Sequence, residues 1–198
     1  MIPVHESLLV LAGYLLGGIP FGLIYSLYIA GEDVRKKGSG NIGATNVRRN
    51  FGWLPGLAVL FLDMAKGALP VAVALHGLQV GGLAVVLTGA AAILGHVYPL
   101  YLKFSGGKGV ATSAGVFLVL APLPLVSALL IFLLAVAVTR YVSVGSISAA
   151  VAFPLATVLY VGLYEEISVA ALIIGLVVIW RHRSNIKNLY RGQEGKFY

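Results

Sequence analysis

Three polar clusters hold most of the side chains in this sequence that could take part in chemistry. Residues 38–49 read GSGNIGATNVRR, residues 95–112 read GHVYPLYLKFSGGKGVAT, and residues 181–194 read RHRSNIKNLYRGQE. Glycine-rich backbone lets amide N–H groups approach an anion closely, and Arg and Lys are common phosphate ligands. The first two clusters therefore predict phosphate binding. The alternative for the first cluster is a flexible loop whose arginines only set topology.

The chain lacks the groups on which several catalytic mechanisms depend. It has no Cys, only seven acidic residues, and no HExxH, GxSxG or His-x4-Asp pattern, which excludes thiolate, two-metal and serine-elbow chemistry. The second cluster fails the P-loop pattern because Gly109 follows Lys108, so it does not predict ATP binding. We expect substrates that bring their own activation and at least one phosphate, while the protein supplies position and charge.

The third cluster contains a histidine that could act as a general base or as a hydrogen-bond acceptor. His182 lies between Arg181 and Arg183, and neighbouring positive charges favour the neutral form of the ring. Asn185 follows three residues later and would share a helix face with it. The alternative is a set of basic anchors for lipid headgroups beside the last membrane helix.

Membrane helices must position these clusters. Of 198 residues, 59% are hydrophobic and 11% charged, against roughly 25% charged in a typical soluble domain. The mean hydropathy is +0.95. A span needs about 20 residues, so seven spans use about 140 and leave no room for a soluble domain. The net charge of +7 is therefore interpreted as topology and substrate binding, and no nucleic acid partner is predicted.

Apolar runs between polar breaks predict an all-α, polytopic membrane helix bundle with seven transmembrane helices, forming one domain over residues 1–198. Five spans fall at about 7–30, 53–75, 79–97, 146–163 and 166–180. The stretch 110–139 is long for one span, and a turn at Pro122-Leu123-Pro124 would divide it into two. Ser146 is expected to cap the sixth span.

The distribution of Lys and Arg predicts the orientation. With seven spans, 13 of the 14 fall in segments on one side, namely 31–52, 97–110, 139–145 and 181–198. A single span over 110–139 would divide them seven against six. The positive-inside rule therefore predicts an outside N-terminus and a cytoplasmic C-terminus. The fourteenth basic residue, Lys66, lies within a span, three residues after Asp63. The two residues could form a functional pair, or an ion pair that only joins helices.

Together and in this order, the clusters resemble the bacterial acyl-phosphate-dependent glycerol-3-phosphate acyltransferases. The resemblance extends to residues 18–22 (GIPFG, with Gly18 where Ser is common), 63–67 (DMAKG) and 140–143 (RYVS). It implies transfer of a fatty acyl group from acyl phosphate to the 1-hydroxyl of glycerol 3-phosphate. The products would be lysophosphatidic acid and phosphate, in the first step of bacterial phospholipid synthesis, with no metal or cofactor.

Residue roles follow from that resemblance. We expect Lys108, Arg49 and Ser39 to bind the phosphate of glycerol 3-phosphate, and His182 and Asn185 to position the attacking hydroxyl, with His182, Asn185 and Lys108 as the catalytic set. Whether His182 or a substrate phosphate oxygen takes the proton stays open. The acyl-phosphate head and the oxyanion would be held by Gly40, Asn41, Thr45, Asn46, Gly106 and Gly107. The remaining predicted substrate-binding residues are Ser143, Arg181 and Glu194.

The predicted partners are the two substrates, membrane lipids and, functionally, the enzyme that makes acyl phosphate. The predicted location is the bacterial inner (plasma) membrane, with the active site facing the cytoplasm. Two other classes remain as alternatives. A carrier for a small organic phosphate would place its polar residues near the midplane, within repeated halves. A lipid-binding or lipid-scrambling protein would not need the Asn, Thr and His residues of the clusters.

Overall fold

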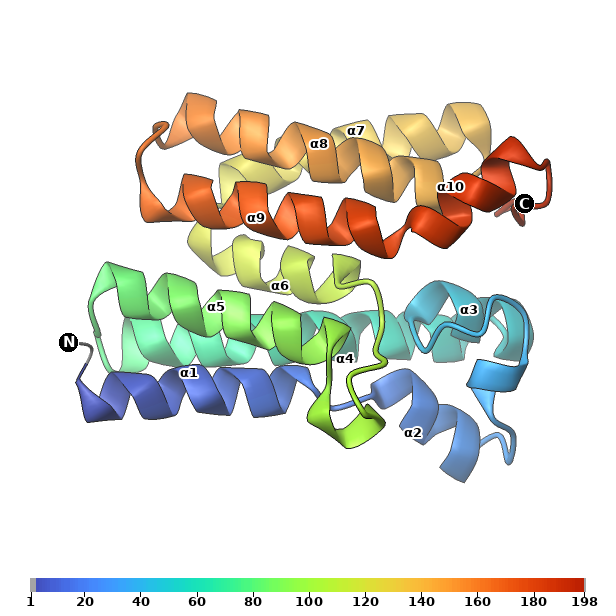
Figure 1. Ribbon diagram of the computed structural model, residues 1–198, viewed down its shortest axis with the longest axis horizontal. Helices are drawn as coiled ribbons and strands as arrows, with labels where there is room; N and C mark the ends of the chain where they lie inside the picture. The colour runs from blue at the N-terminus through green and yellow to red at the C-terminus, as the bar shows by residue number, and fades with distance from the viewer. Residues whose placement is uncertain (1–2, 198) are drawn as a thin grey trace. The chain divides into compact units, whose positions relative to one another are not determined.

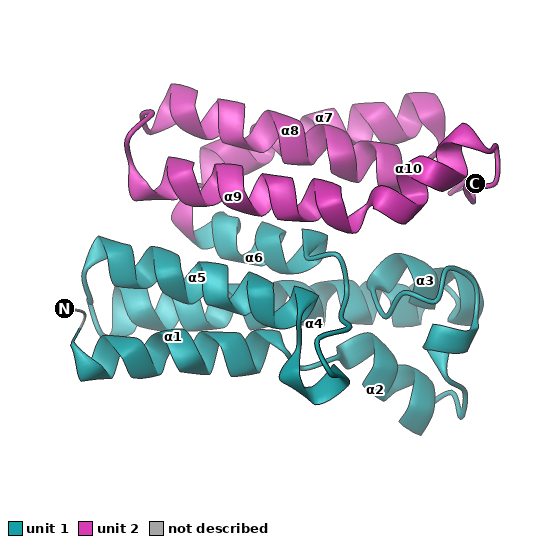
Figure 2. Ribbon diagram, in the orientation of Figure 1, with its two compact units in different colours: residues 1–119 teal, residues 120–198 magenta. Residues whose placement is uncertain are grey.

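The computed structural model describes residues 3–197, and these fold into helices and connecting loops, with no strand among them (Figure 1). The elements in chain order are α1 (Val4–Gly17), α2 (Phe21–Tyr28), the 3₁₀ helix η1 (Val34–Lys36), α3 (Ala44–Phe51), α4 (Trp53–Ala72), the π-helical turn η2 (Val73–Gly77), α5 (Gly82–Val97), the 3₁₀ helix η3 (Leu100–Leu102), α6 (Val110–Leu120), α7 (Pro122–Thr139), α8 (Val142–Tyr160), α9 (Glu166–Arg181) and α10 (Arg183–Tyr190). The chain divides into two compact units, Met1–Val119 (unit 1) and Leu120–Tyr198 (unit 2) (Figure 2).

The predicted helical membrane protein is confirmed, although fewer than seven helices are long enough to span a bilayer. Within residues 3–197, five segments qualify by length and composition, and a sixth does if α9 and α10, bent by 48°, count as one. The helix α6 has 11 residues, which is about 16 Å at 1.5 Å per residue. A hydrocarbon core is about 30 Å thick. The seventh span therefore stays a prediction.

The stretch 110–139 does form two helices, as predicted, but the break lies before the prolines. The helix α6 ends at Leu120, Ala121 leaves helical geometry with φ −150° and ψ 68°, and α7 begins at Pro122. Pro fits the first helical position because no N–H is needed there. The prolines therefore start α7 and do not form the turn between two helices.

The expected cap at Ser146 is wrong, because α8 begins one turn earlier, at Val142. Arg140 takes a left-handed conformation with φ 64° and ends α7, so Tyr141 alone separates it from α8. Ser146 then lies inside the helix, where its hydroxyl donates to the Val142 carbonyl at 2.9 Å.

Close backbone packing fixes the start of the second cluster in unit 1. The helices α1 and α5 approach so tightly that a Cβ on Gly17 would collide with the backbone of Ala92, and one on Gly95 with the Tyr14 carbonyl. Small residues allow such approaches in membrane bundles. The Tyr14 hydroxyl also donates to the Tyr98 carbonyl at 2.6 Å. The carboxyl end of α5 is thereby held beside the break between α1 and α2 (Figure 1).

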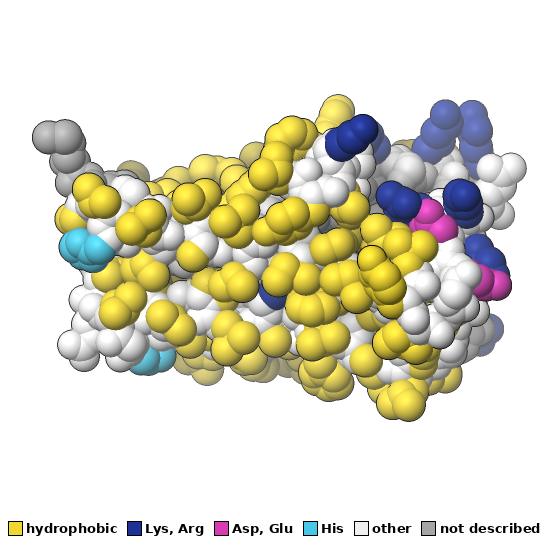
Figure 3. Space-filling model, turned by 90° about the horizontal axis from the view of Figure 1, so that it is seen from below, with side chains coloured by type: hydrophobic (Ala, Val, Ile, Leu, Met, Phe, Trp, Pro, Cys, Tyr) yellow, Lys and Arg dark blue, Asp and Glu magenta, His cyan; other side chains and the backbone are white. Residues whose placement is uncertain are grey.

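The outer surface suits a membrane. Leu130, Leu134, Leu155 and Leu159 each expose more than 60% of their surface. Figure 3 shows one face on which hydrophobic side chains run along the helices, while Lys and Arg gather at one end. So much exposed apolar area would be unfavourable in water and is expected against lipid.

Candidate active site

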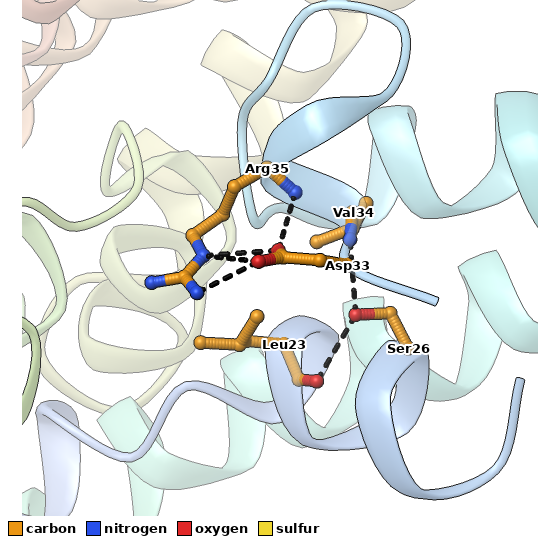
Figure 4. Close-up of polar contacts among 5 residues, drawn as sticks. All are labelled: Leu23, Ser26, Asp33, Val34 and Arg35. Atoms are coloured by element: carbon orange, nitrogen blue, oxygen red, sulfur yellow. Dashed lines mark hydrogen bonds and ion pairs between the residues drawn. The ribbon is translucent and has the colours of Figure 1, made fainter. Parts of the chain in front are cut away.

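The first cluster lies in unit 1 on a loop that is anchored to α2. The hydroxyl of Ser26 accepts the Val34 N–H at 3.3 Å and donates to the Leu23 carbonyl at 3.0 Å (Figure 4). Val34 is fully buried and belongs to a hydrophobic cluster with Leu23, Ile42, Val47 and Val59. The segment that leads to residues 38–43 is therefore attached both to α2 and to this hydrophobic cluster.

The two acids of this loop pair with nearby cations. Asp33 accepts from the Arg35 backbone N–H and from its guanidinium at 2.8–3.2 Å (Figure 4). These hydrogen bonds with Arg35 lower the pKa of Asp33 to about 2. Glu32 pairs with Lys37. Segment 31–52 holds five basic and two acidic residues, so a net charge of +3 remains for an anionic ligand.

Asn46 organises the first cluster. Its side chain is 3% exposed, and its Oδ1 accepts the Ser39 N–H at 3.0 Å. Its Nδ2 donates to the backbone carbonyls of Asn41 at 2.8 Å, Lys37 at 3.1 Å and Val34 at 3.2 Å. An amide has two donors and one acceptor oxygen, so these bonds engage both of its polar groups. Asn46 therefore shapes the loop on which the other predicted residues lie.

The helix α3 carries the exposed basic face of the cluster. Thr45 and Arg49 are four residues apart, both exposed, and so share one side of the helix. Arg48 instead packs over the Trp53 ring, with its guanidinium carbon 4.6 Å from the ring centre. Partial burial, followed by the charge of Arg49, lowers the pKa of Arg48. Ser39, bonded to Asn46, lies beside the same helix.

The second cluster folds back on the end of α5. The N–H of Gly106 donates to the Val97 carbonyl at 3.2 Å, and that of Gly107 to the His96 carbonyl at 3.0 Å. A Cβ on Gly107 would collide with the His96 ring. These amides are used within the loop. Lys108, half-buried, then precedes the first turn of α6, where backbone N–H groups lack intrahelical partners.

The first two clusters share one hydrophobic support. Leu102, in η3 of the second cluster, packs against the group of buried side chains under the first loop. The two glycine-rich segments, far apart in sequence, are thus held by the same core in unit 1. A phosphate site made from both segments stays a prediction.

The third cluster lies in unit 2, where α9 meets α10. The ring of His182 is buried, and its Nδ1 lies 2.7 Å from the Val178 carbonyl oxygen. A carbonyl only accepts, so Nδ1 carries the hydrogen. In the neutral ring, Nε2 is then the basic nitrogen. The tautomer required for a base at Nε2 is set by the backbone of α9.

Glu194 joins two other predicted residues of unit 2. Its Oε1 accepts from the Ser143 hydroxyl and from the Asn185 amide, each at 2.7 Å. The tail is held further by the Phe197 N–H, which donates to the Arg140 carbonyl at 2.7 Å. Arg181 is half-buried at the end of α9. Sequence spacing gave no signal for the bonds that Glu194 makes, because nine and 51 residues separate the partners.

Comparisons with known proteins give the family of this chain. Residues 7–192 match the family described as glycerol-3-phosphate acyltransferase. A curated relative of that name from Syntrophotalea carbinolica is 45% identical over 190 residues and covers 96% of each chain. One from Myxococcus xanthus is 46% identical over 191 residues, covering 96% of this chain and 99% of its own.

Solved structures of PlsY (YgiH), an integral membrane glycerol 3-phosphate acyltransferase, have the same fold. The glycerol 3-phosphate form is 39% identical, with a TM-score of 0.91, and covers 98% of this chain and 96% of its own. The lysophosphatidic acid form is 37% identical, with a TM-score of 0.87 and the same coverage. By sequence over nearly its whole length and by fold, this chain belongs to the glycerol-3-phosphate acyltransferase family.

Proposed function

We propose that this protein transfers a fatty acyl group from acyl phosphate to the 1-hydroxyl of glycerol 3-phosphate. The products are lysophosphatidic acid and phosphate, as expected for the first step of phospholipid synthesis. The observation that carries the proposal is the match over 98% of the chain to an enzyme whose two solved forms are named for glycerol 3-phosphate and lysophosphatidic acid.

Acyl phosphate as donor accounts for the missing nucleophile. It is a mixed anhydride, so its carbonyl is already activated, and phosphate is a good leaving group. The hydroxyl oxygen attacks the carbonyl carbon, the carbon–oxygen bond to phosphate breaks, and phosphate leaves with the electron pair. A chain without Cys can promote this step by holding the two substrates in contact and neutralising charge.

Unit 1 supplies the anion-binding groups in this proposal. Lys108, Arg49 and Ser39 bind the phosphate of glycerol 3-phosphate. The first loop, shaped by Asn46, and the amino-terminal turn of α6 after Lys108 hold the acyl-phosphate head and the oxyanion. The support is that both segments lie on one hydrophobic core and that helix amino-termini favour anions. In the first cluster the holding residues are Gly40, Asn41 and Thr45. Gly106 and Gly107, predicted for the same role, instead donate their N–H groups to the carbonyls of Val97 and His96 and so shape the loop before Lys108.

Unit 2 supplies the groups that act on the hydroxyl. His182 accepts the proton at Nε2, because its Nδ1–H faces the Val178 carbonyl. Asn185 orients the hydroxyl, and Glu194 fixes Asn185 together with Ser143. Arg181 adds positive charge beside His182. The family match over residues 7–192 supports the further proposal that residues 1–198 form a single integral-membrane acyltransferase domain.

We further propose seven passes, with the N-terminus outside and the C-terminus in the cytoplasm of a bacterial inner membrane. The support is that 13 of the 14 Lys and Arg fall in segments 31–52, 97–110, 139–145 and 181–198. The short helix α6 would be the seventh pass. The active site then faces the cytoplasm, and acyl phosphate comes from an enzyme that supplies this membrane.

The test uses the detergent-purified protein with acyl phosphate and glycerol 3-phosphate. We expect lysophosphatidic acid and phosphate to form only when both substrates are present, and acyl-CoA not to replace acyl phosphate. Folded protein that forms no lysophosphatidic acid would overturn the proposal. In that case, uptake of an organic phosphate into proteoliposomes or accelerated lipid exchange between leaflets would identify a carrier or a lipid-scrambling protein.

A further inference from the structure

A buried ion pair in unit 1 has no part in the function proposed above. On α4, Lys66 Nζ lies 2.7 Å from Asp63 Oδ1, and both side chains are 3% exposed. Charges within apolar helices are costly unless they are compensated. An apolar pair of similar size would often stabilise the fold equally well. The other contacts of the two charged groups therefore bear on whether the pair has a role beyond stability.

Lys66 reaches the break in the first membrane segment. Its Nζ donates to the Ile19 carbonyl at 2.7 Å and lies 5.6 Å from the centre of the Phe21 ring. Ile19 stands between α1 and α2, where Pro20 has no N–H to donate. The lysine thus supplies a hydrogen bond to a broken helix and fixes the point at which α2 begins.

The helix α2 contacts the first loop, so the position of its first turn affects the position of that loop. Gly22, in its first turn, lies so close to Ile42 that a Cβ there would collide with the Ile42 carbonyl. Ser26, one turn further, holds Val34. A shift at the start of α2 would therefore move the segment that carries Ser39 and precedes α3.

Asp63 faces the second loop on its other side. Its Oδ1 lies 3.7 Å from His96 Nδ1, and the His96 ring is buried. The opposite edge of that ring contacts Gly107, where a Cβ would collide with Nε2. The His96 carbonyl also accepts the Gly107 N–H at 3.0 Å. The ring is thus wedged between the carboxylate and the residue that precedes Lys108.

We propose that Asp63 and Lys66 are positioning residues that set the two glycine-rich loops in register for the phosphate of glycerol 3-phosphate. Lys66 acts through Ile19 and α2 on the first loop. Asp63 acts through His96 on Gly107 and hence on Lys108. The inference rests on the proposed function. The relative position of the two loops matters only if both bind the same substrate. It decides between the two roles open for this pair, helix joining alone or function.

The test compares kinetic parameters with stability. The double variant Asp63→Leu with Lys66→Met replaces the pair by apolar side chains and is expected to melt at or above the wild-type temperature in detergent. We expect KM for glycerol 3-phosphate to rise roughly ten- to a hundredfold, because small displacements of positioning groups have effects of this size. KM for acyl phosphate should change less.

Two further variants keep the test decisive if the double variant does not fold. His96→Gln leaves the ion pair in place and removes the ring between Asp63 and Gly107, so it should raise the same KM. Thr88→Val is the matched control. This buried hydroxyl donates to the Ala84 carbonyl of its own helix, at 2.8 Å, and its loss should leave KM unchanged.

The outcomes separate this inference from the proposed function. Wild-type protein that forms no lysophosphatidic acid overturns the function. Active wild type with a folded double variant or a folded His96→Gln variant of unchanged KM overturns the inference alone. So does an exchanged pair, Asp63→Lys with Lys66→Asp, that restores wild-type KM, because the exchange keeps the attraction between the two helix positions but moves the cation away from Ile19.

Discussion

The polar residues of the two units are held in different ways. In unit 1 the glycine-rich loops are held through backbone groups, such as the N–H of Ser39 on Asn46 and the N–H of Gly107 on His96. In unit 2 the side chains themselves are bonded, as Asn185 is to Glu194. Substitutions in the loops should therefore act through a whole segment, whereas those in unit 2 should act one side chain at a time.

The acidic residues follow the same division. Asp33 and Glu32, on the exposed loop of unit 1, each pair with a cation of that loop. Glu194, in unit 2, instead accepts hydrogen bonds from neutral groups. In unit 1 these acids thus reduce the net positive charge of the proposed phosphate-binding loop. In unit 2 the acid orients uncharged donors near the residues proposed to act on the hydroxyl. Four substitutions test this contrast.

The largest effect is expected at His182. In His182→Ala, kcat should fall about 10²- to 10⁴-fold, the usual contribution of a general base, while KM for glycerol 3-phosphate changes little. Initial rates of lysophosphatidic acid formation measure both parameters. His76→Ala, at an exposed position after α4, is the control and should be neutral. Near-wild-type turnover of folded His182→Ala would assign the proton to a substrate phosphate.

Lys108 should show the opposite kinetic pattern. In Lys108→Ala, loss of a charge-assisted hydrogen bond costs about 1.5–3 kcal/mol, so KM for glycerol 3-phosphate should rise roughly tenfold to a hundredfold. Lys103→Ala removes an exposed cation from the same loop and should leave KM nearly unchanged. Equal effects of the two substitutions would mean that the loop contributes only general positive charge.

Glu194→Gln tests the side-chain bonds of unit 2. The amide oxygen can still accept, but it loses the charge that strengthens the bonds from Ser143 and Asn185. A weakening of about 1 kcal/mol predicts a kcat about fivefold lower, with KM for glycerol 3-phosphate unchanged. Gln193→Ala, at the exposed neighbour, is the control. A rise in that KM without loss of kcat would make Glu194 part of the phosphate site.

Candidate residues for the site could be predicted from the sequence, but the contacts that hold them could not. Glycine, Lys and Arg within short segments predict an anion-binding loop, because these residue types are the ones that bind phosphate. Nothing in that spacing indicates that Asn46 is the centre of the first loop. Its bonds reach back up to 12 residues, and any of the three Asn in residues 41–50 could have held that place by composition.

The helices were predictable where hydropathy alone determines them. The splitting of 110–139 followed from charge counting, but Ala121 as the break did not, because Pro is compatible with both a turn and a helix start. The length of α6 and the early start of α8 depend on the loops before them. At Arg140 a non-glycine residue takes a left-handed conformation, which propensity does not predict.

The smallest effect is expected at Asp33, and it depends on pH. Its pKa in the folded protein is about 2, below the ordinary 3.8. A lowered pKa contributes stability above the unfolded value, and the contribution disappears as pH falls through the folded value. At pH values above 5, the melting temperature of wild type should thus be slightly higher than that of Asp33→Asn. The difference should shrink and disappear as the pH falls through 2. Glu32→Gln, at a neighbouring exposed acid, is the control for general charge. The expected difference is small because solvent screens exposed pairs. A difference that persists unchanged to pH 2 would show that Asp33 holds the loop by shape and not by its charge on Arg35.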